Sequence, residues 1–218
     1  MPSPFIGIYG GTFDPVHYGH LRTALEVREK LGLDQMRLIP CREPPHRPAP
    51  AATPEQRLHL LHLALRGGDP RLIADDRELA RPGPSYMVDT LASLREEFPT
   101  ASLCLVVGAD AFRGLDRWHR WQSLFELAHV VVMGRPGEDL QAAPERLPNW
   151  VRQRRAADWE RLRQTPVGAI GFVEVTQLAI SASDIRHGLA TGSDPRYLLP
   201  DAVLEQIRSA GLYREASG

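Results

Sequence analysis

The chain has 218 residues, of which 43% are hydrophobic and 24% charged, and its formal net charge is -1 at pH 7. This length fits one domain, and the near-neutral charge balance gives no sign of a protein that binds nucleic acid or another polyanion. No signal-peptide pattern opens the sequence, and no apolar run approaches the ~20 residues that cross a bilayer, so we expect a cytoplasmic protein with no membrane partner.

Short apolar runs alternate with amphipathic segments along the N-terminal half. The run FIGIY predicts a buried strand over residues 5–9, and a helix is predicted to start near Tyr18 and to stop at Gly32. MRLIP predicts a second strand, which the proline-rich CREPPHRPAP cannot continue. The stretch TPEQ at 53–56 indicates a helix start, because Thr caps, Pro takes the first helical position and Gln completes a capping box.

The same alternation continues toward the C-terminus. Further strands are predicted at 71–74, 102–108, 128–134 and 169–175. Further helices are predicted at 85–98, 145–164 and 200–212. The segment 145–164 is charged and contains Trp150 and Trp159, so we expect one surface helix there.

Continuously apolar strands that alternate with helices favour a parallel sheet covered on both faces. We therefore expect one doubly wound, Rossmann-like α/β domain over 1–218, with a C-terminal helical part over roughly 181–218. Cys41 and Cys104 lack metal-ligand and C-x-x-C spacing and are expected to be reduced, structural thiols.

The segment GGTFDPVHYGHL follows the first predicted strand. Ligands of doubly wound sheets bind beyond the carboxyl ends of the strands, so this segment is expected to line a site. Gly10 and Gly11 allow close approach of the backbone, and the helix start adds the positive end of its dipole. The P-loop pattern is absent; instead His17 and His20, three residues apart, can point toward one phosphate. Histidine can carry positive charge near neutrality, which suits charge building on phosphorus.

GGTFDPVHYGHL resembles the G-x-F-x-P-x-H-x-G-H signature of nucleotidyltransferases that attack the α-phosphate of a nucleoside triphosphate, and ISASDIR resembles their I-S-x-x-x-I-R signature. With PPHR, RPGPSYMVDTL, GADAF, RWHRW and MGRPG, the chain is most similar to the bacterial nicotinate-nucleotide adenylyltransferases. The resemblance implies AMP transfer from ATP to nicotinate mononucleotide in NAD biosynthesis. Since the acceptor phosphate is already ionised, catalysis requires positioning and charge stabilisation rather than a general base.

The resemblance implies that the catalytic residues are His17, His20 and Arg186. It implies ATP contacts from Gly10, Gly11, Thr12, Phe13, His46, Arg47, Gly108, Asp110, Ile180, Ser181 and Ser183. Arg47 stands where the family has Lys, and Ala182 and Ser183 replace the commoner Ser-Thr pair. Asp110 could instead cap a helix, and the loop at 46–47 could be merely solvated.

For the mononucleotide, the resemblance implies that Trp118 stacks on the pyridine ring and that Arg135 anchors the phosphate. Trp121 competes for the stacking role, and Trp118 could instead be a core residue. The nicotinate carboxylate is expected at the backbone N–H groups of Ser85, Tyr86 and Met87. Met87 stands where the family commonly has Thr, which leaves acid selectivity less secure.

Mg²⁺ is expected to arrive on the ATP phosphates, without a dedicated protein metal site. Two alternatives remain open at this stage. The acceptor could be the amidated mononucleotide or another phosphate, or the protein could be a nucleotide-sensing module without turnover. Intact His17, His20 and Arg186 argue against the sensor, and the sequence does not give the oligomeric state.

Overall fold

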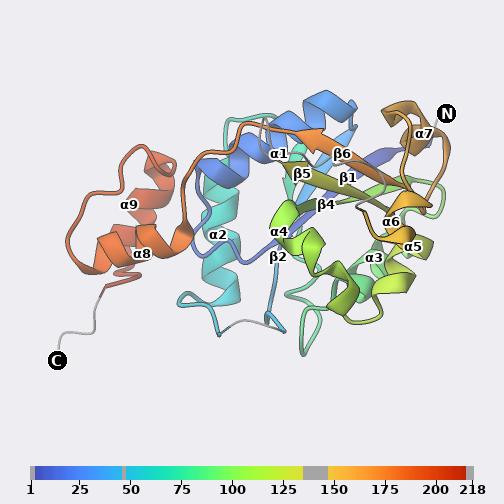
Figure 1. Ribbon diagram of the computed structural model, residues 1–218. Helices are drawn as coiled ribbons and strands as arrows, with labels where there is room; N and C mark the ends of the chain where they lie inside the picture. Colours follow the sequence, from blue (N-terminus) through green and yellow to red (C-terminus); the bar gives the residue numbers. More distant parts are fainter. Residues whose placement is uncertain (1–2, 46–47, 135–146, 215–218) are drawn as a thin grey trace.

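The computed structural model describes residues 3–45, 48–134 and 147–214. Within this part, six strands form one parallel sheet in the order β3-β2-β1-β4-β5-β6 (Figure 1). The strands are β1 (Phe5–Gly11), β2 (Gln35–Pro40), β3 (Leu72–Ala74), β4 (Ser102–Gly108), β5 (His129–Gly134) and β6 (Ile170–Glu174). The predicted doubly wound α/β fold is confirmed, and its switch point in strand order lies between β1 and β4.

Helices cover both faces of the sheet (Figure 1). The α-helices are α1 (Tyr18–Leu31), α2 (Pro54–Leu65), α3 (Met87–Glu97), α4 (Ala109–Arg113), α5 (Leu124–Leu127), α6 (Asn149–Arg152), α7 (Trp159–Gln164), α8 (Ala182–Ala190) and α9 (Asp201–Ser209), with 3₁₀ turns η1 (Leu115–Arg117) and η2 (Trp121–Ser123). None of the helices described could span a membrane.

The two faces of the sheet build separate hydrophobic cores. Helices α1, α2 and α7 pack on one face, where α8 and α9 join the same hydrophobic cluster from beyond α2, and α3, α5 and α6 pack on the other face. Strand β4 serves both, since Cys104 and Val106 point to the first core and Leu103 and Leu105 to the second. This two-sided burial explains why the strands are apolar throughout.

The predicted element boundaries hold where local chemistry sets them. At the start of α2, the Thr53 hydroxyl accepts from the Gln56 N–H at 3.3 Å, and the Gln56 side chain accepts from the Thr53 N–H at 2.9 Å. Helix α1 ends at Gly32, which has a left-handed φ of 66°. Strand β1 extends to Gly11, two residues beyond its predicted end, because its pairing with β2 continues.

The prediction of one surface helix over 145–164 is wrong for its described residues. Two short helices, α6 and α7, are separated by chain that runs beside β6. There the Ala156 N–H donates to the Ile170 carbonyl at 2.8 Å, and Arg155 forms a bridge with Ile170. A backbone paired with a strand cannot also form helical hydrogen bonds, and α7 begins anew where Asp158 accepts from the Arg161 N–H at 3.0 Å.

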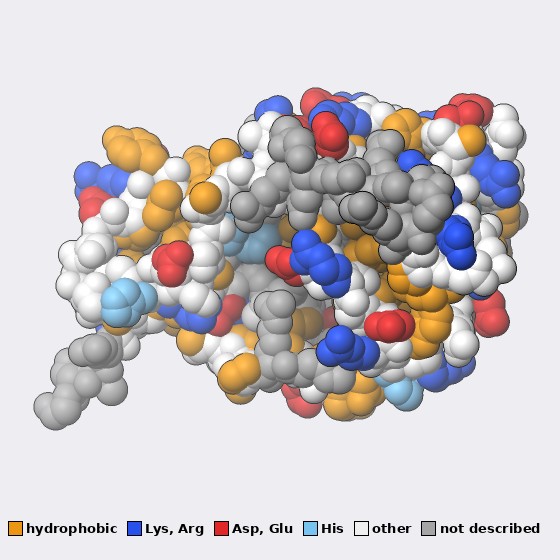
Figure 2. Space-filling model, in the orientation of Figure 1, with side chains coloured by type: hydrophobic (Ala, Val, Ile, Leu, Met, Phe, Trp, Pro, Cys, Tyr) orange, Lys and Arg blue, Asp and Glu red, His pale blue; other side chains and the backbone are white. Residues whose placement is uncertain are grey.

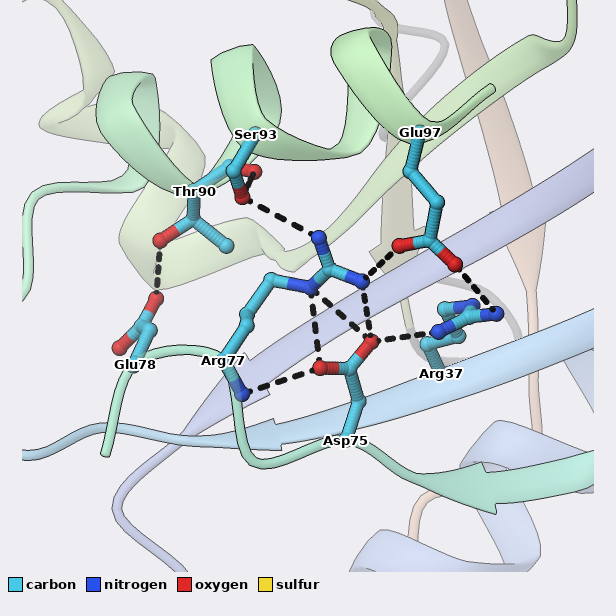
Figure 3. A network of polar contacts seen from close by, with 7 residues as sticks. All are labelled: Arg37, Asp75, Arg77, Glu78, Thr90, Ser93 and Glu97. Atoms are coloured by element: carbon cyan, nitrogen blue, oxygen red, sulfur yellow. Dashed lines mark hydrogen bonds and ion pairs between the residues drawn. The ribbon is translucent and has the colours of Figure 1, made fainter. Parts of the chain in front are cut away.

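A polar network joins α3 to β2 and to the segment after β3 (Figure 3). The buried Asp75 carboxylate accepts from Arg37 at 2.7 Å and from Arg77 at 2.8 Å. Arg77 also donates to Glu97 at 2.7 Å and to the Ser93 hydroxyl at 3.1 Å, and both of these lie on α3. The network therefore fixes α3 against the sheet.

Two carboxyl groups in Figure 3 have opposite electrostatic surroundings. Burial alone would raise the pKa of Asp75, but the hydrogen bonds from Arg77 and Arg37 outweigh it and hold that pKa below its usual value. Burial raises the pKa of Glu78, which hydrogen bonds from Thr90 and Ser85 only partly offset. The Thr90 hydroxyl donates to Glu78 at 2.6 Å.

Removing these two charges should change stability in opposite directions. Asp75→Asn should lower the free energy of unfolding at pH 7 by about 3 kcal/mol, because two half-buried guanidinium groups lose their most closely held anion and keep only Glu97. This deficit should shrink as the pH falls through the lowered folded pKa of Asp75. Glu78→Gln should gain stability relative to wild type as the pH rises through the raised folded pKa of Glu78. Urea unfolding of both variants between about pH 2 and pH 8 measures this, since the lowered pKa of Asp75 lies below its usual value, and changes of the same sign would contradict it.

Candidate active site

The switch point between β1 and β4 forms the floor of the site. Gly10 and Gly11 end β1, and Gly108 ends β4. A Cβ on Gly108 would meet no atom within 4 Å, so this strand end faces open space. Figure 2 shows a hollow between the part of the molecule that contains α8 and α9 and the rest, with histidine surface set back inside it.

The two glycines at the end of β1 are closely covered by side chains. A Cβ on Gly11 would lie 2.9 Å from the Phe13 ring, and one on Gly10 would lie 2.6 Å from the Met87 methyl group. Any larger residue would displace these neighbours. Phe13, which is expected on the ATP side, and Met87, which is expected on the mononucleotide side, thus both pack against the end of β1.

His17 and His20 lie face to face at the start of α1. Their ring centroids are 3.7 Å apart with an interplanar angle of 29°, and the Phe13 ring meets His20 edge-on at 5.0 Å. Nδ1 of His20 accepts from the His17 N–H at 3.4 Å, which leaves the His20 proton on Nε2 as a donor. Nδ1 of His17 is buried and has no hydrogen-bond partner among the described residues.

The histidine pair differs in charge from the expectation. Burial lowers the pKa of His17 to about 4. Burial, followed by repulsion from His17, lowers the pKa of His20 to about 3. Both rings are therefore neutral in the free protein at neutral pH. A neutral imidazole still offers one N–H donor to a phosphate oxygen.

The second motif lies directly against the first. Ser181 caps α8, and its hydroxyl accepts from the Asp184 N–H at 3.4 Å. The Arg186 guanidinium donates to the Ser183 hydroxyl at 3.2 Å and to the backbone carbonyl of Asp14 at 2.6 Å. Ile180 lies beside Gly19, with its Cβ 3.7 Å from where a Cβ on that glycine would stand. The starts of α1 and α8 thus face one region.

Asp14 is a central residue that the sequence reasoning missed. Its side chain is buried, at 4% exposure. Its carboxylate accepts from the N–H groups of Ala51 and Ala52 at 2.8 and 3.1 Å, and from the Tyr213 hydroxyl at 2.7 Å. Its position inside the first motif could have indicated a role at the site. Its three hydrogen-bond partners could not be foreseen, because they lie far away in the sequence.

Arg57 is a second residue that the sequence reasoning missed. It has no exposed surface, and its guanidinium donates to the carbonyls of Thr12 at 2.7 Å, Cys41 at 2.6 Å and Ala52 at 3.2 Å. These bonds hold the segments after β1 and β2 against α2. The available signal was an arginine within the apolar face of α2, one turn before Leu60.

The segment expected to bind the mononucleotide lies at the start of α3. The Ser85 N–H already donates to the Glu43 carbonyl at 2.9 Å, and the Tyr86 N–H to the Pro84 carbonyl at 3.1 Å. Met87 is the first residue of α3, where N–H groups have no intrahelical acceptor. The N–H groups of Ser85 and Tyr86 are therefore already occupied, and the free donors are those of the next two residues, Met87 and Val88.

The RWHRW segment contacts this helix start. The rings of Tyr86 and His119 are 4.3 Å apart. Trp121 packs on Trp150 at 5.0 Å and on Phe125 at 6.3 Å, which makes it part of an aromatic cluster. Trp118 is half-buried beside the same core. Trp121 is thus engaged in packing on other aromatic rings.

The structure describes some of the remaining expected site residues and not others. Asp110 lies in the first turn of α4 with its side chain 99% exposed, and it pairs with Arg113. It does not cap the helix, because Gly108 occupies the N-cap position. Three expected residues lie outside the described part of the chain, namely His46, Arg47 and Arg135.

Comparisons with known proteins agree with this geometry. Residues 8–188 match the cytidylyltransferase-like family. A protein of Methylococcus capsulatus, named probable nicotinate-nucleotide adenylyltransferase, is 56% identical over 208 residues, which cover 95% of this chain and 99% of that protein. A protein of Halorhodospira halophila with the same name is 52% identical over 213 residues, which cover 98% and 97%.

The fold is also that of a solved structure, the Plasmodium falciparum nicotinic acid mononucleotide adenylyltransferase complexed with NaAD. The TM-score is 0.72 at 16% identity, and the match covers 96% of this chain and 97% of that one. At this identity the likeness supports the fold alone, whereas the bacterial relatives and the family match extend over the motifs. The chain belongs to the nicotinate-nucleotide adenylyltransferases of the cytidylyltransferase-like family.

Proposed function

We propose that the protein transfers the adenylyl group of ATP to nicotinate mononucleotide, which gives nicotinate adenine dinucleotide and pyrophosphate in NAD biosynthesis. The observation that carries this proposal is the junction of the two motifs at the β1/β4 switch point. There Arg186 of the second motif donates to the carbonyl of Asp14 in the first, at 2.6 Å. The names of the bacterial relatives support the same reaction.

The reaction requires no side-chain nucleophile. An oxygen of the acceptor phosphate forms a bond to the α-phosphorus of ATP while the bond to the β-phosphate oxygen breaks, and pyrophosphate leaves. The neutral His20 offers its Nε2–H to the reacting phosphate as negative charge develops. The N-termini of α1 and α8, with Ser181, Ser183 and Arg186, hold the other phosphates.

Magnesium enters this scheme with ATP, as part of the substrate. No group of three or more His, Cys, Asp or Glu side chains that could hold a metal gathers in the part of the chain that the structure describes. Magnesium commonly keeps waters and substrate phosphates as ligands, so MgATP suits a site built from backbone N–H groups and a guanidinium.

The acceptor is held from the side of α3. The N–H groups of Met87 and Val88 open this helix and have no intrahelical acceptors, so they offer a carboxylate site at the positive end of the helix dipole. Trp118 supplies an aromatic face next to His119, whose ring contacts Tyr86. The contact between Met87 and Gly10 brings this site next to the end of β1.

The acceptor preference tests the proposed function. With MgATP, nicotinate mononucleotide should give pyrophosphate with a kcat/KM roughly ten- to a hundredfold above that of the amide, the worth of one charge-assisted hydrogen bond. Pyrophosphate release and product chromatography measure this. Equal use of both acceptors would contradict the carboxylate site, and ATP binding without release of pyrophosphate would favour a nucleotide-sensing module.

His20→Ala should lower kcat by roughly 10²- to 10³-fold, because a donor to the developing charge is lost. The KM for ATP should change much less, since this contact strengthens in the transition state. The matched control is His59→Ala, on the exposed side of α2. Near-normal turnover of the His20 variant in steady-state assays would show that His20 only packs against His17 and Phe13.

Trp118→Ala should raise the KM for the mononucleotide roughly five- to tenfold and leave that for ATP unchanged, because stacking is worth on the order of 1 kcal/mol. Trp121→Ala is the comparison, since Trp121 packs on Trp150 and should mainly lower the melting temperature. Steady-state kinetics and thermal unfolding of both variants measure this. The reversed pattern would assign the stacking role to Trp121.

A further inference from the structure

We propose that Tyr213, near the C-terminal end of the chain, is a positioning residue for the ATP-phosphate site. Its hydroxyl donates to the Asp14 carboxylate at 2.7 Å across 199 positions of sequence. This inference rests on the proposed function only in that it takes the ligand of this site to be ATP.

The Asp14 carboxylate depends on this hydroxyl for one of its hydrogen bonds. It is buried and accepts from two backbone N–H groups, those of Ala51 and Ala52, and from one side-chain donor, Tyr213. A buried carboxylate is costly unless its oxygens are hydrogen-bonded. The Tyr213 bond therefore helps to keep the Asp14 carboxylate in place inside the first motif.

Arg186 stands close enough to compete for the same carboxylate. Its guanidinium donates to the Asp14 backbone carbonyl at 2.6 Å and lies 3.8 Å from Oδ2 of Asp14. With the Tyr213 hydroxyl on Oδ1, the carboxylate is held by three donors and attracts Arg186 less strongly. Without the hydroxyl, the carboxylate can turn toward Arg186 and withdraw that cation from a bound triphosphate.

The backbone on both sides of this hydrogen bond is strained. Tyr213 has a φ of 61°, and Phe13, directly before Asp14, has a φ of 50°. Left-handed conformations are unfavourable for residues other than glycine and persist only where the surrounding structure enforces them. The chain reaches this position by turning back after α9, where Gly211 has a φ of 63° and the Leu212 N–H donates to the Ile207 carbonyl at 3.0 Å.

The junction also lies where separate parts of the chain meet. Asp14 follows β1, Ala51 and Ala52 precede α2, Arg186 belongs to α8, and Tyr213 follows α9 (Figure 1). Helices α2 and α9 pack against each other. A single hydroxyl at this point can therefore set the distance between the first motif and Arg186, which are the two sides of the proposed phosphate site.

The test removes only the hydroxyl. Tyr213→Phe should raise the Kd and the KM for MgATP by roughly tenfold, the effect of losing one hydrogen bond to a charged group, and leave the KM for the mononucleotide unchanged. The matched control is Tyr197→Phe, because Tyr197 is also left-handed, with a φ of 66°, but is 85% exposed. Calorimetric titration with MgATP in the absence of acceptor gives the Kd without any turnover.

A double-mutant cycle provides the second readout. In an Asp14→Asn background, adding Tyr213→Phe should change the Kd for MgATP little, because the neutral amide cannot draw Arg186 away from the triphosphate. An unchanged Kd in Tyr213→Phe with a lower melting temperature would overturn the proposal. It would show that the hydroxyl only holds the C-terminal end of the chain against the fold. Additive effects, or an equal rise in both KM values, would overturn it as well.

The test of Tyr213 and the test of the proposed reaction can be told apart by their results. Wild-type protein that binds MgATP but forms no nicotinate adenine dinucleotide would contradict the proposed function, while the Kd values of the two tyrosine variants would still decide the role of Tyr213. Wild-type protein that does not bind MgATP would overturn both proposals.

Discussion

The buried carboxylate of Asp14 is the interaction on which the site depends. Asp14 follows β1, and its carboxylate accepts from the backbone before α2 and from Tyr213. The backbone carbonyl of the same residue accepts from Arg186. A charge that is buried must be matched by fixed donors, so these segments cannot move independently. Arg57 is the corresponding buried cation, and its guanidinium donates to the carbonyls of Thr12 and Cys41.

The histidines of the site carry no positive charge in the free protein at neutral pH. Burial lowers the pKa of His17 to about 4, and burial together with repulsion from His17 lowers the pKa of His20 to about 3. Among the residues that the structure describes, Arg186 and the starts of α1 and α8 therefore contribute positive potential to the site of the free protein. A neutral N–H donor that is already oriented needs little rearrangement when charge develops on a phosphate, which is what electrostatic preorganisation requires.

The acceptor side is positioned through the sheet. The network of Asp75, Arg77 and Glu97 fixes α3 against β2 (Figure 3), and α3 in turn places Met87 over Gly10. Since Gly10 belongs to the same strand end as the ATP motif, the separation of the two proposed substrate sites is set by one helix start and one strand. A substitution in this network should therefore disturb the proposed acceptor site more than the proposed phosphate site.

The sequence by itself determined the α/β class, the strands, the cap of α2 at Thr53 and the two motifs, because apolar periodicity, capping and motif spacing are local properties. Only the tertiary structure decided that the segment 145–164 is broken beside β6, that the histidines are neutral, and that Arg57 and Tyr213 form hydrogen bonds with Thr12 and Asp14 of the first motif. Burial sets the histidine pKa values, and the partner of Tyr213 lies 199 positions away. Such effects depend on which distant groups the fold brings together, and no local pattern contains that information.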